Sequence, residues 1–273
     1  MKILFFGTAS AVPAAGNGFT SFIVSLGDAF VLVDTGDNPV RALREAGLDP
    51  ALLDAVVLTH AHVDHLGAYP ALVSTLDCMA RRKELVVIAA GPTAAAARRV
   101  LHAFDIREEG LSFPIRYAEN FGDGGAGGAG VSGGRPGNGK PAAGFSVSLL
   151  PGNHTIPTSM VLFEEDGLRL LYSADIRHDG GVRLFPGGCD ALVHEATYPH
   201  EALPDPTGHS SALQAGAAAA KAGAGIRFLC HILGDSYPAG LRPRDEAGRA
   251  FDGRIVEPDL LTWYTIDHAE RYH

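Results

Sequence analysis

Short apolar runs separated by glycine, proline and charged residues set the pattern of the first half of the chain. The runs are four to six residues long, too short for typical helices, and favour buried strands. The strands predicted in this half are Lys2–Phe6, Phe22–Leu26, Ala29–Asp34, Ala55–Leu58 and Leu85–Ala89.

Three helices are predicted between these strands. The first runs from about Pro39 to the stop at Gly47. The second covers Leu66–Leu76. The third is rich in alanine and runs from Pro92 to about Phe104, because proline suits the first turn of a helix.

From Ser146 onward the same order of elements repeats in coarse form. One helix, Ser210–Ala222, is expected among further strands. These strands are Ser146–Leu150, Met160–Phe163, Arg169–Tyr172, Ala191–His194 and segments near Phe228 and Trp263. Two sets of strands, each accompanied by helices, predict an α/β fold with two sheets flanked by helices.

The segment Gly122–Gly144 interrupts the pattern. It contains eleven glycines, two prolines and almost no large apolar residues. Such a composition offers nothing to bury, so a flexible loop is expected here.

Length and composition favour a single large domain over residues 1–273. A chain of 273 residues with 46% apolar content can bury a full core. The apolar run after Lys2 is shorter than a secretory signal needs, and no run is long enough to span a bilayer. The three cysteines, Cys78, Cys189 and Cys230, are odd in number and lack a Cys-x-x-Cys spacing, which favours a reducing, cytoplasmic setting.

The net charge of −9 argues against indiscriminate binding to nucleic acid, whose affinity depends on neutralising phosphates. It does not exclude a local basic patch. Basic residues do gather in the middle of the chain, at Arg81-Arg82-Lys83 and Arg98-Arg99, although a solvated helix face also accounts for each of them.

The strongest chemical signal is Thr59-His60-Ala61-His62-Val63-Asp64-His65, directly after the strand Ala55–Leu58. In extended backbone His60 and His62 point to the same side, so both can bind one ion. Imidazole and carboxylate are ligands that zinc prefers, and they also admit manganese or iron. The segment therefore predicts a metal site at the end of a strand.

The pattern His-x-His-x-Asp-His after a strand resembles the metallo-β-lactamase superfamily, whose further ligands come from distant strand ends. Three matching positions follow apolar runs: His154, Asp175 and His231. The resemblance implies an αββα sandwich with the metals at one edge. It also implies one zinc ion held by His60, His62 and His154, a second held by Asp64, His65 and His231, and Asp175 bridging the two. Asp64 would also orient the attacking water.

Three further segments resemble the ribonuclease Z-like phosphodiesterase branch of that superfamily. They are Gly7-Thr8 with Pro13, His194-Glu195-Ala196-Thr197, and Gly208-His209-Ser210-Ser211. In that branch the glutamate and the second histidine form a proton-delivery pair, which corresponds to Glu195 and His209. An imidazole backed by a carboxylate can protonate an alkoxide leaving group near neutral pH. Departures from the pattern are Val63, Ala174 where glycine is common, and the segment Leu233–Tyr237.

The sequence therefore predicts a hydrolase with two divalent metal ions that cleaves phosphodiester bonds. The first candidate reaction is endonucleolytic trimming of tRNA 3′ ends. Alternatives are a cyclic-nucleotide or other small nucleotide phosphodiesterase, a carboxylic ester, lactone or thioester hydrolase on the same metals, and a non-catalytic metal-binding protein. The expected partners are an RNA or small nucleotide substrate and a second copy of the chain in a homodimer, with no membrane.

We expect replacement of Gly122–Gly144 by a short linker to leave thermal stability nearly unchanged, because long loops add little closure entropy and this one buries nothing. Thermal unfolding of the two forms checks this, and a large loss of stability would contradict it. If the shortened protein cleaves small diesters but no longer cleaves RNA, the segment is a substrate-binding arm.

Overall fold

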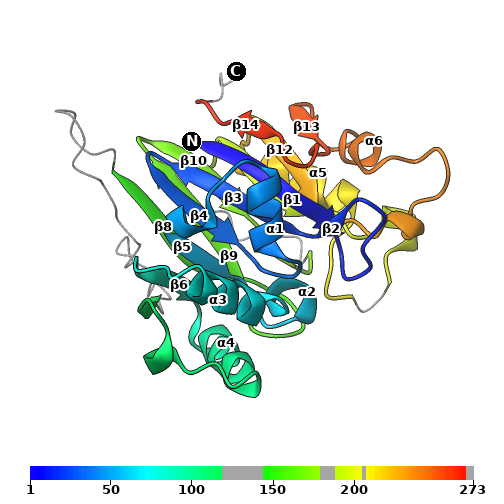
Figure 1. The fold of residues 1–273 in the computed structure, drawn as a ribbon. Coiled ribbons are helices and arrows are strands. Elements are labelled where there is room, and N and C mark those ends of the chain that lie inside the picture. The colour runs from blue at the N-terminus through cyan, green and yellow to red at the C-terminus, as the bar shows by residue number, and fades with distance from the viewer. Residues whose placement is uncertain (119–143, 179–187, 205–206, 269–273) are drawn as a thin grey trace.

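Two β-sheets pack face to face in the computed structural model, which describes residues 1–118, 144–178, 188–204 and 207–268 (Figure 1). In the first sheet the strand order is β14-β1-β3-β4-β5-β6-β7, with β2 beside β1. Its strands are β1 (Lys2–Ala9), β2 (Gly18–Phe19), β3 (Ser21–Leu26), β4 (Ala29–Val33), β5 (Ala55–Leu58), β6 (Leu85–Ala89), β7 (Ile115–Ala118) and β14 (Trp263–Thr265).

The second sheet has the order β13-β12-β11-β10-β9-β8. Its strands are β8 (Phe145–Pro151), β9 (Ser159–Glu165), β10 (Leu168–Tyr172), β11 (Ala191–Glu195), β12 (Ile226–Cys230) and β13 (Arg254–Val256). The strands from β10 to β13 are parallel, so their carboxyl ends meet at one edge of the sheet.

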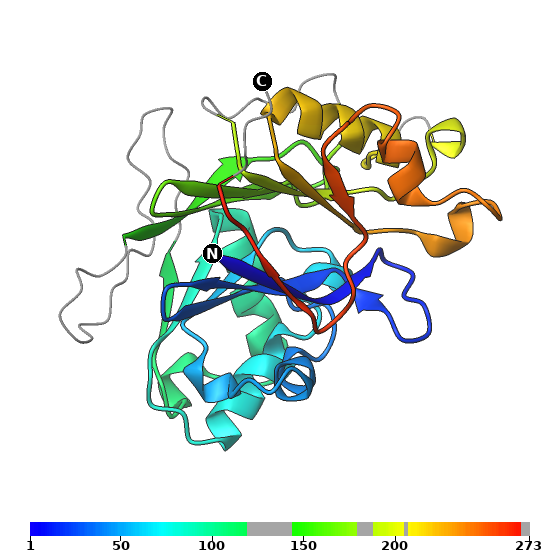
Figure 2. The ribbon, with the colours of Figure 1, turned by 90° about the horizontal axis from the view of Figure 1, so that it is seen from above.

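Helices cover the outer face of each sheet, which gives four layers (Figure 2). On the first sheet these are α1 (Pro39–Glu45), α2 (Val63–Leu66), α3 (Tyr69–Cys78) and α4 (Gly91–Ala103), and on the second α5 (Ala212–Ala222) and α6 (Pro243–Ala247). Short 3₁₀ turns lie at Pro50–Leu52, Glu108–Gly110, His200–Ala202 and Gly234–Ser236. The predicted αββα sandwich is confirmed. Among the described residues, no helix has the length and apolar character needed to cross a membrane.

Along the strands, apolar side chains face alternately inward and outward, and this explains the four layers. Phe5 and Phe22 of the first sheet face Phe163 and Phe228 of the second in a fully buried core between the sheets. The intervening residues, such as Leu4 and Ile23, point outward and pack under helices α1 and α3. Because side chains alternate along a strand, each apolar strand supplies both an inner and an outer core.

Backbone hydrogen bonds join the two sheets at the edge where the predicted ligands lie. Ser159 N donates to Thr59 O at 3.0 Å, and Ser10 N donates to Ile232 O at 3.1 Å. The backbone N–H of His231 donates to Thr20 Oγ1 at 2.9 Å. These contacts bring the loop after β5 close to the loops of the second sheet.

Two of the predicted helices are wrong in their boundaries. The single helix Leu66–Leu76 is two helices, because Ala68 N donates to Thr35 O, outside the helix, and α3 then starts at Tyr69 with Pro70 in its first turn. The helix predicted from Ser210 begins at Ala212, since Ser211 is its cap and forms a capping box with Gln214. Ser210 instead donates to Ile176 O.

Four short elements, β2, β7, β13 and α6, have no counterpart in the prediction. Their two to five residues give too short a pattern to recognise. The predicted loop Gly122–Gly144 lies outside the described residues except for Gly144. The single-domain assignment stays a prediction.

We expect Gly216→Ala in α5 to lower stability by about 1–3 kcal/mol through overpacking. Helix propensity alone would favour alanine by about 1 kcal/mol. Here, however, a β-carbon would meet the backbone oxygen of Ala247 in α6 at 2.3 Å. Gly110→Ala is the control, because no atom lies within 4 Å of its added carbon, and a change within about 0.5 kcal/mol is expected. Denaturant unfolding measures both variants, and a stabilised Gly216→Ala protein would refute the prediction.

Candidate metal centre

All seven predicted metal-binding residues converge at the edge where strand ends of both sheets meet. His60 and His62 follow β5, and Asp64 and His65 lie in α2, which starts there. The remaining three follow strands of the second sheet: His154 after β8, Asp175 after β10 and His231 after β12.

The side chains form two groups that share Asp175. The potential ligand atoms of His60, His62, His154 and Asp175 lie within 4.8 Å of one another, as do those of Asp64, His65, His231 and Asp175. A third group of the same kind contains Glu195, His209 and His231. The two predicted ligand sets and the predicted proton-delivery pair are thus brought together in space.

Distances in the first group fit a metal ion. His62 Nδ1 lies 3.1 Å from His60 Nε2 and 3.2 Å from His154 Nε2. Asp175 Oδ2 lies 3.6 Å from His60 Nε2 and 3.7 Å from His154 Nε2. Nitrogen ligands at about 2.0–2.1 Å from a tetrahedral zinc ion would be separated by about 3.3–3.4 Å. The spacing therefore matches that of a ligand set.

The second group is similar and contains atoms that lack a hydrogen bond. His231 Nε2 lies 3.3 Å from both Asp64 Oδ2 and Asp175 Oδ2. His65 Nε2 lies 3.4 Å from Asp175 Oδ1 and 3.5 Å from Asp64 Oδ2. His65 Nε2 and Asp175 Oδ1 are both buried without a hydrogen-bond partner. Because unsatisfied buried polar atoms are costly, these residues fit a bound cation.

A second layer of hydrogen bonds orients the imidazole rings. Asp34 Oδ2 lies 2.8 Å from His65 Nδ1 and accepts a hydrogen bond from Thr59 Oγ1. Because the Thr59 hydroxyl donates to Asp34, it accepts from His60 Nδ1, 3.0 Å away. Each ring therefore carries its proton on Nδ1 and presents the Nε2 lone pair to the centre.

Hydrogen bonds also fix the Nδ1 atoms of the histidines that follow strands of the second sheet. Thr197 Oγ1 donates to Glu195 Oε2 at 2.6 Å and so accepts from His231 Nδ1 at 2.9 Å. His154 Nδ1 donates to Gly208 O at 2.7 Å. Asp34 and the orienting roles of Thr59 and Thr197 are missing from the sequence prediction. The sequence feature that could have identified Asp34 as a site residue is its position directly after a buried strand.

Backbone strain accompanies the site. Asp34, Ala174 and His231 all have positive φ angles, of 57°, 50° and 52°. Residues with side chains seldom adopt this conformation, and it concentrates at functional sites. The φ angle of Ala174 explains why glycine suits that position.

Burial sets the protonation of the histidines. Burial, followed by the charge of His65, lowers the pKa of His60 to about 2, and burial also lowers the pKa of His62 and His154. Burial acts in the same direction on His65, but the carboxylates of Asp175 and Asp34 raise its pKa well above the ordinary value. A metal ion bound at His65 Nε2 would displace the additional proton that this raised pKa keeps on the ring.

Glu195 and His209 lie beside the two groups. The buried Glu195 carboxylate accepts from Ile176 N at 2.6 Å, Thr197 Oγ1 at 2.6 Å and Ser210 N at 3.0 Å, and lies 3.3 Å from His209 Nδ1. Burial by itself lowers the pKa of His209, but the hydrogen bond and charge of Glu195 raise it above the ordinary value. The His209 side chain is 23% exposed, so solvent or a substrate can reach it.

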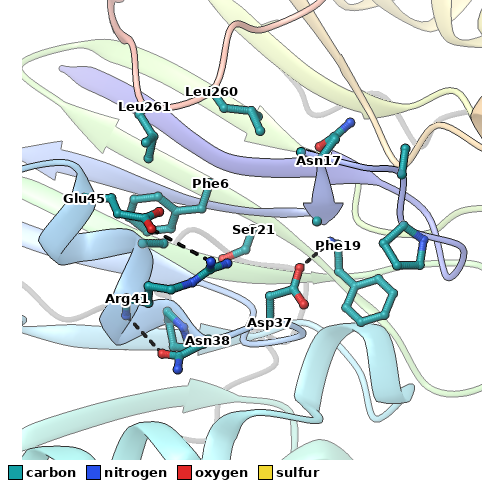
Figure 3. Close-up of a pocket in the computed structure, with 16 residues that line it drawn as sticks. Phe6, Asn17, Phe19, Ser21, Asp37, Asn38, Arg41, Glu45, Leu260 and Leu261 are labelled. Carbon is teal, nitrogen blue, oxygen red and sulfur yellow. Dashed lines mark hydrogen bonds and ion pairs between the residues drawn. The ribbon is translucent and has the colours of Figure 1, made fainter.

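A cleft of about 490 Å³ is lined by residues before and within α1 and by the loop after β1 (Figure 3). Its walls include Phe6, Phe19, Asp37 and Arg41, and it contains none of the seven residues of the two groups. Asp37, two residues before α1, accepts a hydrogen bond from Phe19 N of β2 at 2.8 Å (Figure 3).

Comparisons with known proteins agree with this architecture. The chain is 28% identical to a ribonuclease Z from Salinibacter ruber, over 97% of this chain and 94% of that protein. The fold resembles that of the metallo-beta-lactamase fold protein YhfI from Bacillus subtilis, with a TM-score of 0.72, 19% identity, and coverage of 96% of this chain and 98% of that one. It also resembles human tRNase Z, short form, with a TM-score of 0.72, 18% identity, and coverage of 98% and 100%.

The resemblance to the ribonuclease Z-like branch, predicted from the motifs, is confirmed by these relatives. A family model described as the beta-lactamase superfamily domain matches residues 30–232, which is well over half of the 273 residues. The chain belongs to the beta-lactamase superfamily.

Proposed function

We propose that this protein is a dinuclear metal hydrolase that cleaves phosphodiester bonds in RNA, as a ribonuclease Z-type enzyme. The observation that carries the proposal is the sharing of Asp175 by two metal-competent groups, with the His209–Glu195 pair beside them. Similarity to ribonuclease Z sequences over nearly the whole chain supports the choice of substrate class.

We assign His60, His62 and His154 to one ion, and Asp64, His65 and His231 to the other, with Asp175 contacting both. Zinc is the proposed metal because neutral imidazole and carboxylate donors suit it. Two bound divalent ions would acidify a water molecule and stabilise negative charge on the phosphoryl oxygens.

The chain's own residues then position the substrate and move a proton. Asp64 Oδ2 lies 3.3 Å from His231 Nε2, so both would face the same ion, and the Asp64 carboxylate would also orient the attacking water. Glu195 fixes His209 through its Nδ1 atom. This leaves the other ring nitrogen of the His209 imidazolium to donate a proton to the leaving oxygen as its bond to phosphorus breaks.

Two other activities would use the same metal-binding residues. They are hydrolysis of small cyclic or nucleotide diesters and hydrolysis of carboxylic esters, lactones or thioesters. One assay separates them, by comparing pre-tRNA, a cyclic nucleotide, a bis-aryl phosphodiester and an acyl ester with the metal-loaded protein. Cleavage of the acyl ester alone would overturn the proposal. The homodimer and the cytoplasmic location stay predictions.

Metal content gives the first prediction of this proposal. The wild-type protein is expected to hold two ions per chain, because seven ligand side chains exceed what one tetrahedral ion can use. Asp175→Ala should hold fewer than two, since it removes a ligand from both sites. Asp252→Ala, at an exposed carboxylate, is the control and should retain two. Elemental analysis after metal supplementation decides, and one ion or none in the wild type would refute the dinuclear assignment.

The role of His209 gives the second prediction. For an alkoxide leaving group, His209→Ala should lower turnover by about 10²–10⁴-fold, because the general acid is lost. A nitrophenolate leaves without a proton, so turnover of a nitrophenyl diester should fall far less. Metal content should not change, and His102→Ala, an exposed histidine of α4, should behave like the wild type.

Turnover of an alkyl and a nitrophenyl phosphodiester by these variants measures the difference. Equal losses on both substrates, or loss of an ion from His209→Ala, would show that His209 is not the acid.

A further inference from the structure

One exposed arginine lies beside the metal centre, in the loop after β10. Arg177 comes two residues after Asp175, and its side chain is exposed. No other lysine or arginine of the chain lies within two residues of a proposed metal ligand, of Glu195 or of His209. Because arginine stays protonated, Arg177 adds a permanent positive charge to a site whose other ionisable side chains are imidazoles and carboxylates.

Hydrogen bonds tie Arg177 to two loops of the centre. Its backbone N donates to Asn153 O at 2.6 Å, next to the proposed ligand His154. Its side-chain Nε donates to Thr207 O at 2.5 Å, two residues before the proposed acid His209. The side chain of Arg177 therefore contacts the loop that carries His209.

The backbone just before Arg177 is fixed as well. Ile176 N donates to Glu195 Oε1 at 2.6 Å, and Ile176 O accepts from Ser210 Oγ at 2.7 Å. Both partners are fully buried. A side chain that extends from a fixed backbone and is held at Nε loses less conformational freedom when it binds a ligand. These contacts therefore prepare Arg177 for binding.

The rest of the Arg177 guanidinium is available to a ligand. A guanidinium carries five N–H donors, and Thr207 O accepts the one on Nε. Among the described residues, Nη1 and Nη2 of Arg177 have no acceptor. The buried Arg81 differs, because its Nε, Nη1 and Nη2 atoms all donate to backbone carbonyls. Arg177 instead presents two nitrogen atoms in the planar arrangement that suits two oxygens of a phosphate.

The contact with the His209 loop indicates which phosphate Arg177 would bind. In the proposed reaction the scissile phosphate lies at the two metal ions, which neutralise its charge. His209 faces the leaving oxygen, and Arg177 is bonded to the same loop, so Arg177 lies on the side of the leaving fragment. The first charge of that fragment is the phosphate one nucleotide before the scissile bond.

We propose that Arg177 binds the phosphate on the 5′ side of the scissile phosphate, in an RNA strand whose ribose 3′-oxygen leaves. This inference rests on the proposed function and adds a substrate contact to the metal ligands and the acid. The contact requires two consecutive phosphates, so it favours RNA over cyclic nucleotides and other substrates with a single phosphodiester.

Cleavage of chemically altered RNA by the metal-loaded protein tests the contact. A methylphosphonate removes the charge of one phosphate. At the proposed position in pre-tRNA, it should lower kcat/KM of the wild type about tenfold, mainly through KM, because charge-assisted hydrogen bonds are lost. Arg177→Ala should cleave unmodified pre-tRNA about tenfold less efficiently and show no further loss with the methylphosphonate. Arg249→Ala, at an exposed arginine after α6, is the control and should match the wild type with both RNAs.

The outcomes separate substrate binding from a structural role. If Arg177 only braced the loop of His209, Arg177→Ala would lower kcat, and the methylphosphonate would lower kcat/KM of the variant as much as that of the wild type. That result would overturn the inference, as would a dependence on the phosphate at the 3′ side instead. A wild type that cleaves no RNA would refute the proposed function, whereas one that cleaves both RNAs equally would refute this inference alone.

Affinity for the product gives a measurement that does not depend on turnover. A short single-stranded RNA that ends in the released 3′-hydroxyl carries the phosphate in question. Loss of one phosphate contact should reduce the slope of log Kd against log salt concentration by about 0.7 in Arg177→Ala. An unchanged slope would contradict the assignment of Arg177 to this phosphate.

Discussion

The Asp175 carboxylate is the constraint on which the rest of the site depends. It is 1% exposed and lies 3.3–3.7 Å from ring nitrogens of His60, His65, His154 and His231. Burial raises the pKa of this carboxyl, but the charges of His231 and His65 lower it well below the ordinary range. A carboxylate in that position is stable only if positive charge surrounds it. The strands that deliver the four histidines must therefore end at one place, and the packing of the two sheets serves that requirement.

The second layer of hydrogen bonds orients the histidines of the site. Asp34, Thr59 and Thr197 use their hydrogen bonds to fix the Nδ1 atoms of His60, His65 and His231. Each threonine hydroxyl has its own proton directed to a carboxylate, so it can only accept from the ring. In the metal-bound state the Nε2 atoms of these rings would all face the ion, once His65 has lost its additional proton. Order in the second layer thus prepares the centre for a metal ion.

The order of elements and the family resemblance predicted the αββα layers, and the predicted site residues meet at one edge of the structure, because apolar runs followed by His or Asp are local patterns. The sequence could not predict hydrogen-bond partners that are close only in space. Asp34 Oδ2, for example, lies 2.8 Å from His65 Nδ1, although the two residues are 31 positions apart in the chain. The break between α2 and α3 depends on a tertiary hydrogen bond from Ala68 to Thr35, which no local pattern records. Arg227 of β12 is the clearest case, because an arginine in a strand is expected to reach water, whereas here the side chain is fully buried.

The proposed ligands are separated widely along the chain: Asp64 and His231, whose side chains meet, are 167 residues apart. A nascent polypeptide emerges from the ribosome amino end first, so the His-x-His-x-Asp-His segment is available long before His231. Until then it can offer only part of a coordination sphere, in a sheet whose partner sheet does not yet exist. The full set of proposed ligands therefore exists only after synthesis has passed His231, so the complete centre can assemble only on a nearly finished chain.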